Sequence, residues 1–249
     1  MIDTGVYFPI RVFDGKADDP ELTFNRFECE NFTHEEYFHC PLNRLLPFQV
    51  QGQVQLTPGY LVDMCTGDGT QISLNMASDD VNGRSWESHM GTDLSGFAPG
   101  LYSFRGSMAP GHHYSDPFYL SADVSQMVHL KYRDKGVKGS FLWREGLWAE
   151  CYIDTIIEKP TYPIHEEAER TQDNEMHRLF QRWEKRHMIT FKGVESMADA
   201  MSVLPVMDEV YVNGQRVFDV MVDITWDDEY SCLALIEISF LRHKLIKTF

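Results

Sequence analysis

The chain has 249 residues, of which 43% are hydrophobic and 13% aromatic, enough for one large domain or two small ones with real cores. This composition excludes a chain that is disordered throughout, and no apolar run is long enough to cross a bilayer. The formal net charge of −16 argues against nonspecific nucleic-acid binding, because an acidic protein repels a polyanion. The N-terminus has neither a basic start nor an apolar stretch, so the sequence predicts no signal peptide and a protein made in a cytoplasm.

The cysteines are scattered, odd in number and without a C-x-x-C pair. This pattern predicts buried free thiols in preference to a disulfide framework or a zinc knuckle. Cys65 or Cys151 could serve as a nucleophile only if a nearby cation lowered the pKa of its thiol.

Residues 1–45 are predicted to form an N-terminal arm. Aromatic residues occur there without a helical or strand period, which is typical of a segment lying across another surface. That surface belongs either to the same chain or to a neighbouring subunit, and Phe24, Phe27 and Phe32 are the interface candidates.

The segment His34-Glu-Glu-Tyr-Phe-His-Cys40 has the residue types of a metal site but not the spacing. The H-E-x-x-H motif places its two histidines one helical turn apart, whereas His34 and His39 are five residues apart. The sequence therefore predicts an ordinary polar loop and no metal ligands.

Residues 46–160 are predicted to form an antiparallel β-sandwich domain. Half-buried strand patterns are punctuated by Pro-Gly and Asp-Gly turns. Asp63 to Gly69 is read as a hairpin turn, because it lacks the regular ligand spacing of a calcium loop, and 77–99 is read as a polar loop. The predicted strands are 45–56, 60–65, 70–76, 100–106, 114–120, 127–132, 139–143 and 148–158.

Residues 161–181 are predicted to be a charged interaction loop between two domains. The prolines at 160 and 163 interrupt a strand, and the apolar stripe that follows is too thin to decide between a helix and an extended loop. A loop on a rigid scaffold is a natural contact site. The interface candidates here are Tyr162, Glu166, Glu167, Arg170 and Gln172.

Residues 182–249 are predicted to form a small α+β domain with the order β-α-β-β-β and a basic C-terminal tail. A strand up to Phe191 is followed by a helix over 196–204, with a capping box at Ser196 and Asp199. Asn213-Gly214 marks a hairpin, and two long strands follow over 217–226 and 231–241. The last is predicted to be a central strand, because both of its faces are apolar.

No catalytic motif is present: there is no G-x-S-x-G, no phosphate-binding loop and no dinucleotide fingerprint. The sequence therefore predicts no enzyme, no catalytic residue and no cofactor. A carbohydrate-binding or cell-surface adhesion module is the alternative, since exposed aromatics on a sandwich stack on sugars. Its candidates are Trp86, Tyr102, Tyr114 and Trp148. A hydrolase using two of the 38 acids is a third alternative.

Several phrases together resemble structural proteins of phages that infect Bacteroidetes, in particular the tail-barrel ring proteins of crAss-like phages. They are Pro41–Phe48, Gly100–Phe104 with Tyr114–Phe118, Trp183–Phe191, Ser196–Met201, Asp208–Val212 and Trp226. The resemblance spans most of residues 41–241 and is one of order and texture, with no invariant motif.

This resemblance implies a virion protein of the tail, assembled in the host cytoplasm. It implies a ring or adaptor subunit near the portal that forms a cyclic homo-oligomer, contacts other tail or portal proteins and lines part of the DNA conduit. DNA would pass through such a ring without sequence-specific binding, and no membrane would be involved. Subunits of a closed ring make head-to-tail contacts, which extended arms can supply.

Overall fold

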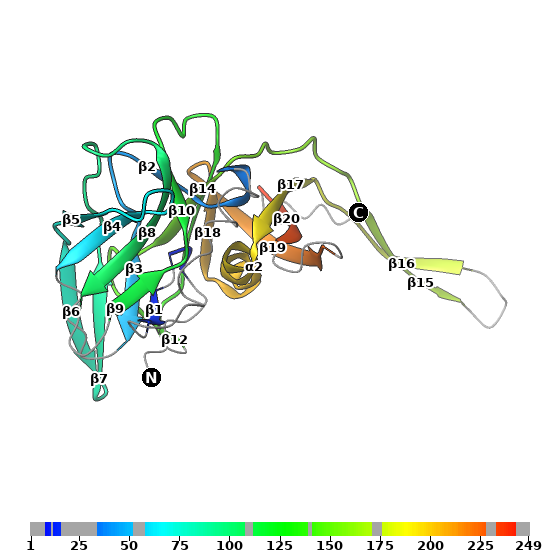
Figure 1. Cartoon of the computed structure of the whole chain (residues 1–249). Helices are drawn as coiled ribbons and strands as arrows, with labels where there is room; N and C mark the ends of the chain where they lie inside the picture. The colour runs from blue at the N-terminus through cyan, green and yellow to red at the C-terminus, as the bar shows by residue number, and fades with distance from the viewer. Residues whose placement is uncertain are drawn as a thin grey trace.

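The computed structural model describes residues 8–10, 12–15, 34–51, 58–107, 112–138, 141–170, 176–227 and 233–242. Its architecture is mainly β, as the sequence predicts (Figure 1). The strands of the first half are β1 (Val12–Gly15), β2 (His39–Pro41), β3 (Phe48–Gln51), β4 (Gly59–Asp63), β5 (Gly69–Ile72), β6 (Met76–Val81), β7 (Arg84–His89), β8 (Gly100–Ser107), β9 (His112–Ser115) and β10 (Phe118–Ser121).

Helices are few and short. The described chain contains one α-helix, α2 (Glu195–Ser202), and the 3-10 turns η1 (His34–Glu36) and η2 (Leu204–Val206). Among the described residues, none of these helices has the length and apolarity needed to cross a membrane. The remaining strands are β11 (Val128–Arg133), β12 (Gly136–Lys138), β13 (Phe141–Trp143), β14 (Ala149–Ile153), β15 (Ile164–Arg170), β16 (Met176–Trp183), β17 (Arg186–Val194), β18 (Glu209–Val212), β19 (Gln215–Trp226) and β20 (Leu233–Leu241).

One mixed sheet organises the molecule. Its strand order is β1-β9-β8-β10-β2-β14-β11-β18-β19-β20-β17, with β4 and β5 attached beside β8. The pairs are antiparallel except β10 with β2, which run parallel. The sheet crosses the boundary expected near residue 160, because β18 pairs with β11 through Leu130 and Val212. The core is likewise continuous and includes residues from both sides of that boundary.

The β18–β19 hairpin makes this connection at its turn. Asn213 and Gly214 have φ of 49° and 75°, the left-handed pair that the Asn-Gly signal predicts. The Asn213 N–H donates to the His129 carbonyl at 2.8 Å, and the Asn213 side-chain oxygen accepts from the His129 N–H at 2.8 Å. The predicted hairpin is confirmed, and its turn is bonded to β11.

The described part of the N-terminal segment packs into the chain's own body. β1 pairs with β9, and β2 lies between β10 and β14. Phe8 is buried and stacks on Trp143, with ring centroids 5.3 Å apart. The predicted aromatic arm therefore lies on its own chain wherever the structure describes it.

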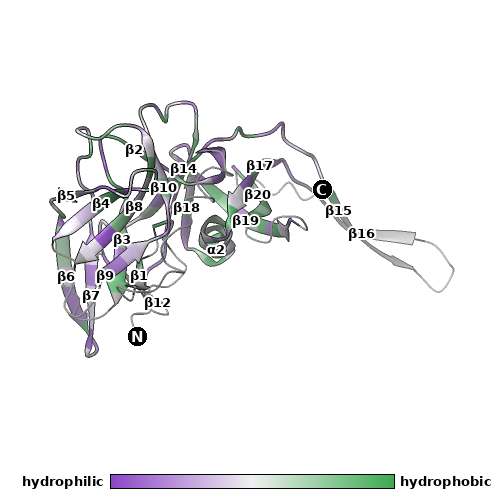
Figure 2. Ribbon diagram, in the orientation of Figure 1, coloured by the Kyte–Doolittle hydropathy of each residue, from purple (hydrophilic) through white to green (hydrophobic). Residues whose placement is uncertain are grey.

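A second sheet has the order β3-β7-β6, and its strands β6 and β7 occupy residues 76–89, the first part of the polar loop predicted for residues 77–99. That prediction is wrong because Asn82-Gly83 is itself a hairpin signal, with φ of 53° and 74° at the β6–β7 turn. The sheet contacts the main sheet where Phe48 of β3 meets Phe104 of β8, with ring centroids 4.9 Å apart. The β6–β7 hairpin projects from the body and is largely hydrophilic (Figure 2).

The C-terminal part of the main sheet is covered by the helix α2. α2 packs on β17, β19 and β20 through Met197 and Met201, both fully buried. Gly193 of β17 allows this contact, because a Cβ there would lie 3.0 Å from the Met197 sulfur. The capping box is wrong: the helix begins at Glu195 with Val194 as N-cap, and Ser196 is buried in the first turn.

β20 is central, as predicted, between β19 and β17. Only one of its faces is fully covered, however. Ala234, Ile236 and Phe240 are buried on the side of the helix, whereas Leu235 is 37% exposed on the other side. The outer face of this three-stranded region is therefore open to solvent or to another chain.

Candidate functional site

Residues 161–181 contain a β-hairpin in place of the predicted loop or helix. β15 pairs antiparallel with β16 from Ile164 opposite Trp183 to Arg170 opposite Met176, with a bulge at Glu167 and Ala168. The hairpin was not predicted, because neither β15 nor β16 has a clear alternation of apolar and polar residues. Each strand gains its backbone hydrogen bonds only by pairing with the other. We call this hairpin, residues 164–183, the arm; it extends away from the body (Figure 1).

The arm is held at its root by backbone hydrogen bonds to the edge of the main sheet. The Thr161 N–H donates to the Arg186 carbonyl at 2.8 Å, and the Arg186 N–H donates back at 3.0 Å. The Glu184 N–H donates to the Pro163 carbonyl at 3.2 Å, which closes the base of the hairpin. The arm is therefore attached to a hydrogen-bonded sheet edge.

Large apolar side chains are exposed beside this root. Ile156, Tyr162 and Ile164 are 73%, 65% and 55% exposed. All three side chains are open to solvent. Among the predicted interface residues, Tyr162 is thus solvent-accessible, as an interface residue must be.

The other predicted interface residues divide into two groups. Glu166, Glu167 and Arg170 lie on β15, within the arm. Gln172 and the aromatics Phe24, Phe27 and Phe32 lie outside the described residues. The structure therefore gathers Tyr162, Glu166, Glu167 and Arg170 on one projecting element and its root.

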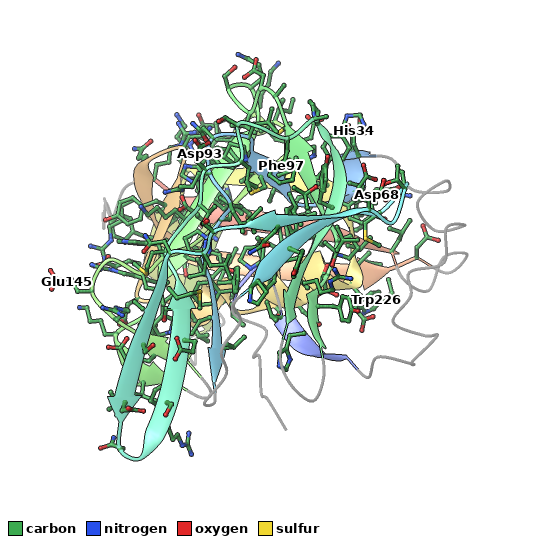
Figure 3. The ribbon with its side chains drawn as sticks, turned by 60° about the vertical axis from the view of Figure 1, so that its left-hand side comes forward. His34, Asp68, Asp93, Phe97, Glu145 and Trp226 are labelled. Atoms are coloured by element: carbon green, nitrogen blue, oxygen red, sulfur yellow. The ribbon has the colours of Figure 1, made fainter. Side chains whose placement is uncertain are left out.

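A second group of polar residues lies where η1 meets the end of β14. Because His39 of β2 pairs antiparallel with Tyr152 of β14, the residues before β2 lie next to those after β14. This pairing brings His34 and Glu35 to Asp154, with one ligand atom from each within 4.8 Å of the others. Figure 3 shows His34 at the periphery of the body. Asp154 could not be predicted as a neighbour of His34 and Glu35, because it is distant from them along the chain.

His39 lies behind this group and is completely buried. Its Nδ1 is 2.6 Å from the Ser121 hydroxyl. Its ring contacts the rings of His34 and Tyr119 at centroid distances of 6.0 and 5.4 Å. Burial lowers the pKa of His39 to about 4, so the imidazole is neutral at physiological pH.

A buried ion-pair network fixes the loop after β2. Glu150 is 3% exposed, and its carboxylate forms an ion pair with Arg44. The same carboxylate forms a hydrogen bond with His129 Nε2, at 3.1 Å. The His129 ring stacks on Tyr152, with centroids 4.5 Å apart. Burial alone would raise the pKa of Glu150, but the His129 hydrogen bond and the charges of Arg44 and Lys131 outweigh burial and lower it.

The aromatics proposed for sugar stacking are not an exposed set. Trp86 and Tyr102 are 1% and 6% exposed and belong to the core. Trp148 is half-buried, with Lys131 Nζ 4.7 Å and the Arg133 guanidinium 4.2 Å from its ring centroid. Tyr114 is half-buried as well. The prediction that Trp86 and Tyr102 are available to a ligand is wrong.

The cysteines considered as nucleophiles have different settings. Cys151 is fully buried, and burial raises the pKa of its thiol well above the ordinary value. Cys65 is exposed in the turn between β4 and β5, where the Asp63 carboxylate accepts from the backbone N–H groups of residues 65 and 66. The Asp63 turn is a hairpin, as predicted. Burial thus removes the thiolate that Cys151 would need as a nucleophile.

Comparisons with protein-family models, with curated proteins and with solved structures find no match to this chain. The function proposed for it therefore rests on its own residues: an anchored projecting arm, exposed apolar side chains at the arm root, and a strongly acidic charge.

Proposed function

We propose that this protein is a virion structural protein, a ring or adaptor subunit of a phage tail that forms part of the DNA conduit near the portal. The observation that carries the proposal is the arm, which is anchored to a sheet edge and extends away from the body (Figure 1). In this proposal the protein is a cyclic homo-oligomer that also contacts other tail or portal proteins. It is assembled in the host cytoplasm and resides in the tail of the virion.

The arm supports self-assembly for a physical reason. An isolated two-stranded hairpin is marginally stable in water, because it buries little apolar surface. A partner surface that covers the arm and the exposed Ile156, Tyr162 and Ile164 would supply the missing burial. Identical copies that contact each other head to tail, arm on body, close into a ring when the rotation between them closes.

The net charge of −16 supports the conduit role. A channel lined by negative charge repels the phosphate backbone, so DNA can slide without being held.

The arrangement of the two halves of the chain also suits this role. We propose that residues 46–160 act as a sandwich-like platform, in which the β3-β7-β6 sheet covers part of the main sheet, and that residues 182–249 carry the arm.

The carbohydrate-binding alternative is less well supported. It requires aromatic rings that a sugar can reach, and Trp86 and Tyr102 are buried. Trp148 is flanked by two cations, which occupy space that a stacked sugar would need.

The proposal predicts that removing the arm abolishes self-assembly. Residues 164–183 can be replaced by Gly-Gly, because Pro163 and Glu184 are already hydrogen-bonded. We expect the intact chain to form a closed oligomer of defined mass and the armless chain to be a monomer, as measured by mass photometry and sedimentation velocity.

The β6–β7 hairpin provides the matched control, since it also projects from the body (Figure 3). Residues 80–85 can be replaced by Asn-Gly, which joins the paired residues Asp79 and Trp86. This variant should assemble like the intact chain. An intact chain that stays monomeric at about 10 µM, well above the dissociation constants of stable assemblies, would contradict the proposal, as would an armless chain of unchanged oligomeric mass.

A further inference from the structure

We propose that the free edge of β19 binds the C-terminal tail of a neighbouring copy, residues 242–249, as an added strand. The inference rests on the self-assembly proposed above. It adds a second contact between copies, in which the arm takes no part.

Half of β19 has a neighbouring strand on one side only. On that side β19 pairs with β20 as far as Trp226 opposite Ala234. On the other side its described partner is β18, which pairs no further along β19 than Val210 opposite Val217. Beyond the bulge at Phe218–Met221, no described strand pairs with β19 on this side. This part of β19 is therefore a sheet edge, to which an extended segment of another chain can add.

The backbone groups at this edge point away from β20. The Asp227 N–H donates to the Leu233 carbonyl of β20 at 2.9 Å. In an antiparallel pair, alternate residues bond to the same neighbouring strand. Counting back from Asp227, the odd-numbered residues of β19 bond to β20, and the N–H and C=O groups of the even-numbered residues face the free side. We call these even-numbered residues the edge residues; they are Val222, Ile224 and Trp226.

Large apolar side chains are exposed along the same edge. Met221 and Trp226 are 56% and 46% exposed. η2 lies next to β19, and its Val206 is 61% exposed. The edge thus offers backbone groups that can bond to a further strand and apolar surface that such a strand would cover.

The edge is acidic, whereas the C-terminal tail is basic. Asp223 is exposed in the middle of the free part of β19 and makes no ion pair with a described residue. It lies opposite Glu237 of β20, so two carboxylates are neighbours there. The tail contains Arg242, Lys244 and Lys247 and no acidic residue. Opposite charges therefore favour this tail as the segment that adds to β19.

The order of residues in the tail also matches the edge. Residues two apart in a strand lie on the same face of the sheet. Over Met221–Thr225 one face carries an apolar, an acidic and a polar residue in turn, with Asp223 in the middle. Over Leu245–Phe249 alternate residues are apolar, basic and apolar, with Lys247 in the middle. Lys247 can therefore lie beside Asp223 whether the added strand runs parallel or antiparallel to β19.

The topology favours a tail from a neighbouring copy over the tail of the same chain. β20 ends at Leu241, which lies opposite Phe218 on the side of β19 away from the free edge. The tail of the same chain would have to cross β19 and reverse its direction to reach this edge. A neighbouring copy has no such constraint, and in a closed ring each copy gives one tail and receives one.

The test is hydrogen exchange of the full chain, resolved to single amides. In the intact chain the amides of the edge residues should exchange slowly. Reversing the charge of the tail with Lys244→Glu and Lys247→Glu should speed their exchange by at least about tenfold, because the added strand no longer protects them. The amides of Asp223 and Thr225 bond to β20 and should keep their exchange rates in this variant.

The matched control makes the same change of charge elsewhere. Arg84→Glu with Lys135→Glu alters two exposed positions outside β19 and should leave the edge residues slow to exchange. Asp223→Lys added to the charge-reversed tail should restore slow exchange, because the two partners attract each other again with their signs exchanged. Failure of this restoration would overturn the pairing of Lys247 with Asp223.

A photoreactive amino acid in place of Ile246 shows which copy supplies the tail, in a mixture of isotopically light and heavy chains. We expect cross-links to β19 that join light to heavy peptides. Cross-links to β19 only between peptides of the same label would overturn the assignment to a neighbouring copy. Fast exchange of the edge residues in an intact chain that is oligomeric by mass would overturn the added strand alone, whereas an intact chain that stays monomeric would contradict the self-assembly.

Discussion

Replacing Trp86 by alanine is expected to lower the free energy of unfolding by about 3–5 kcal/mol, the range for removing a large aromatic side chain from a core. Trp86 lies on β7, the middle strand of the β3-β7-β6 sheet, and is 1% exposed. Its removal leaves a cavity that the neighbouring strands cannot fill completely. Urea denaturation followed by circular dichroism measures the change.

Trp148→Ala is the matched control for this prediction. Trp148 is half-buried, and its contacts are with Lys131, Arg133 and the edge of Tyr211. Cation–π contacts at such sites contribute about 0.5–1 kcal/mol each, so this variant should lose less stability than Trp86→Ala. If Trp86→Ala kept the stability of the intact chain but lost binding on a glycan array, the carbohydrate-binding alternative would replace the proposal made here.

Replacing Arg44 by methionine is expected to cost about 3 kcal/mol of stability at neutral pH. Breaking a buried ion pair by removing one partner costs about 3–5 kcal/mol, because the other charge is left buried without compensation. The lower end applies, since the Arg44 side chain is 42% exposed while that of Glu150 is 4% exposed, and His129 still contacts the Glu150 carboxylate.

A double-mutant cycle separates the unpaired charge from lost packing. Glu150→Gln in the Arg44→Met background should recover much of the lost stability, because the buried carboxylate is then neutral. Arg84→Met, at an exposed position on β7, is the control and should change stability by less than about 0.5 kcal/mol. Losses from Arg44→Met and Glu150→Gln that simply add would contradict the proposed coupling.

Glu150 also predicts how stability depends on pH. Its pKa in the folded chain is lowered, so folding favours the carboxylate. This contribution is complete above the unfolded pKa of about 4.3 and is lost as the pH falls through the folded pKa. The stability difference between the intact chain and Glu150→Gln should therefore shrink as the pH is lowered from 6 to about 3. A difference that stays constant over this range would contradict the lowered pKa.

The features that sequence reading found are those with local signals. Residues close together along the chain predict the Asn213-Gly214 turn and the helix with Met197 and Met201 on one face. The same holds for the long strands that follow this helix. The β6–β7 hairpin has the same kind of signal at Asn82-Gly83, and there the polar composition of its strands obscured the strand pattern.

The features that sequence reading missed depend on pairing between distant segments. The arm forms because β15 and β16 complete each other's hydrogen bonds. The main sheet continues past residue 160 because β18 pairs with β11. Asp154 reaches His34 through the pairing of β2 with β14. A single sequence contains no signal of these partners, so the group around His34 and the shape of the arm emerge only from the fold.

The account depends most on the arm contacting another copy of the chain. A photoreactive amino acid placed at Glu167 in the arm tests this directly in a mixture of isotopically light and heavy chains. We predict cross-links that join light to heavy peptides, from the arm of one copy to the body of the next. Cross-links confined to peptides of the same isotopic label would show that the arm folds back on its own chain, and would contradict the account.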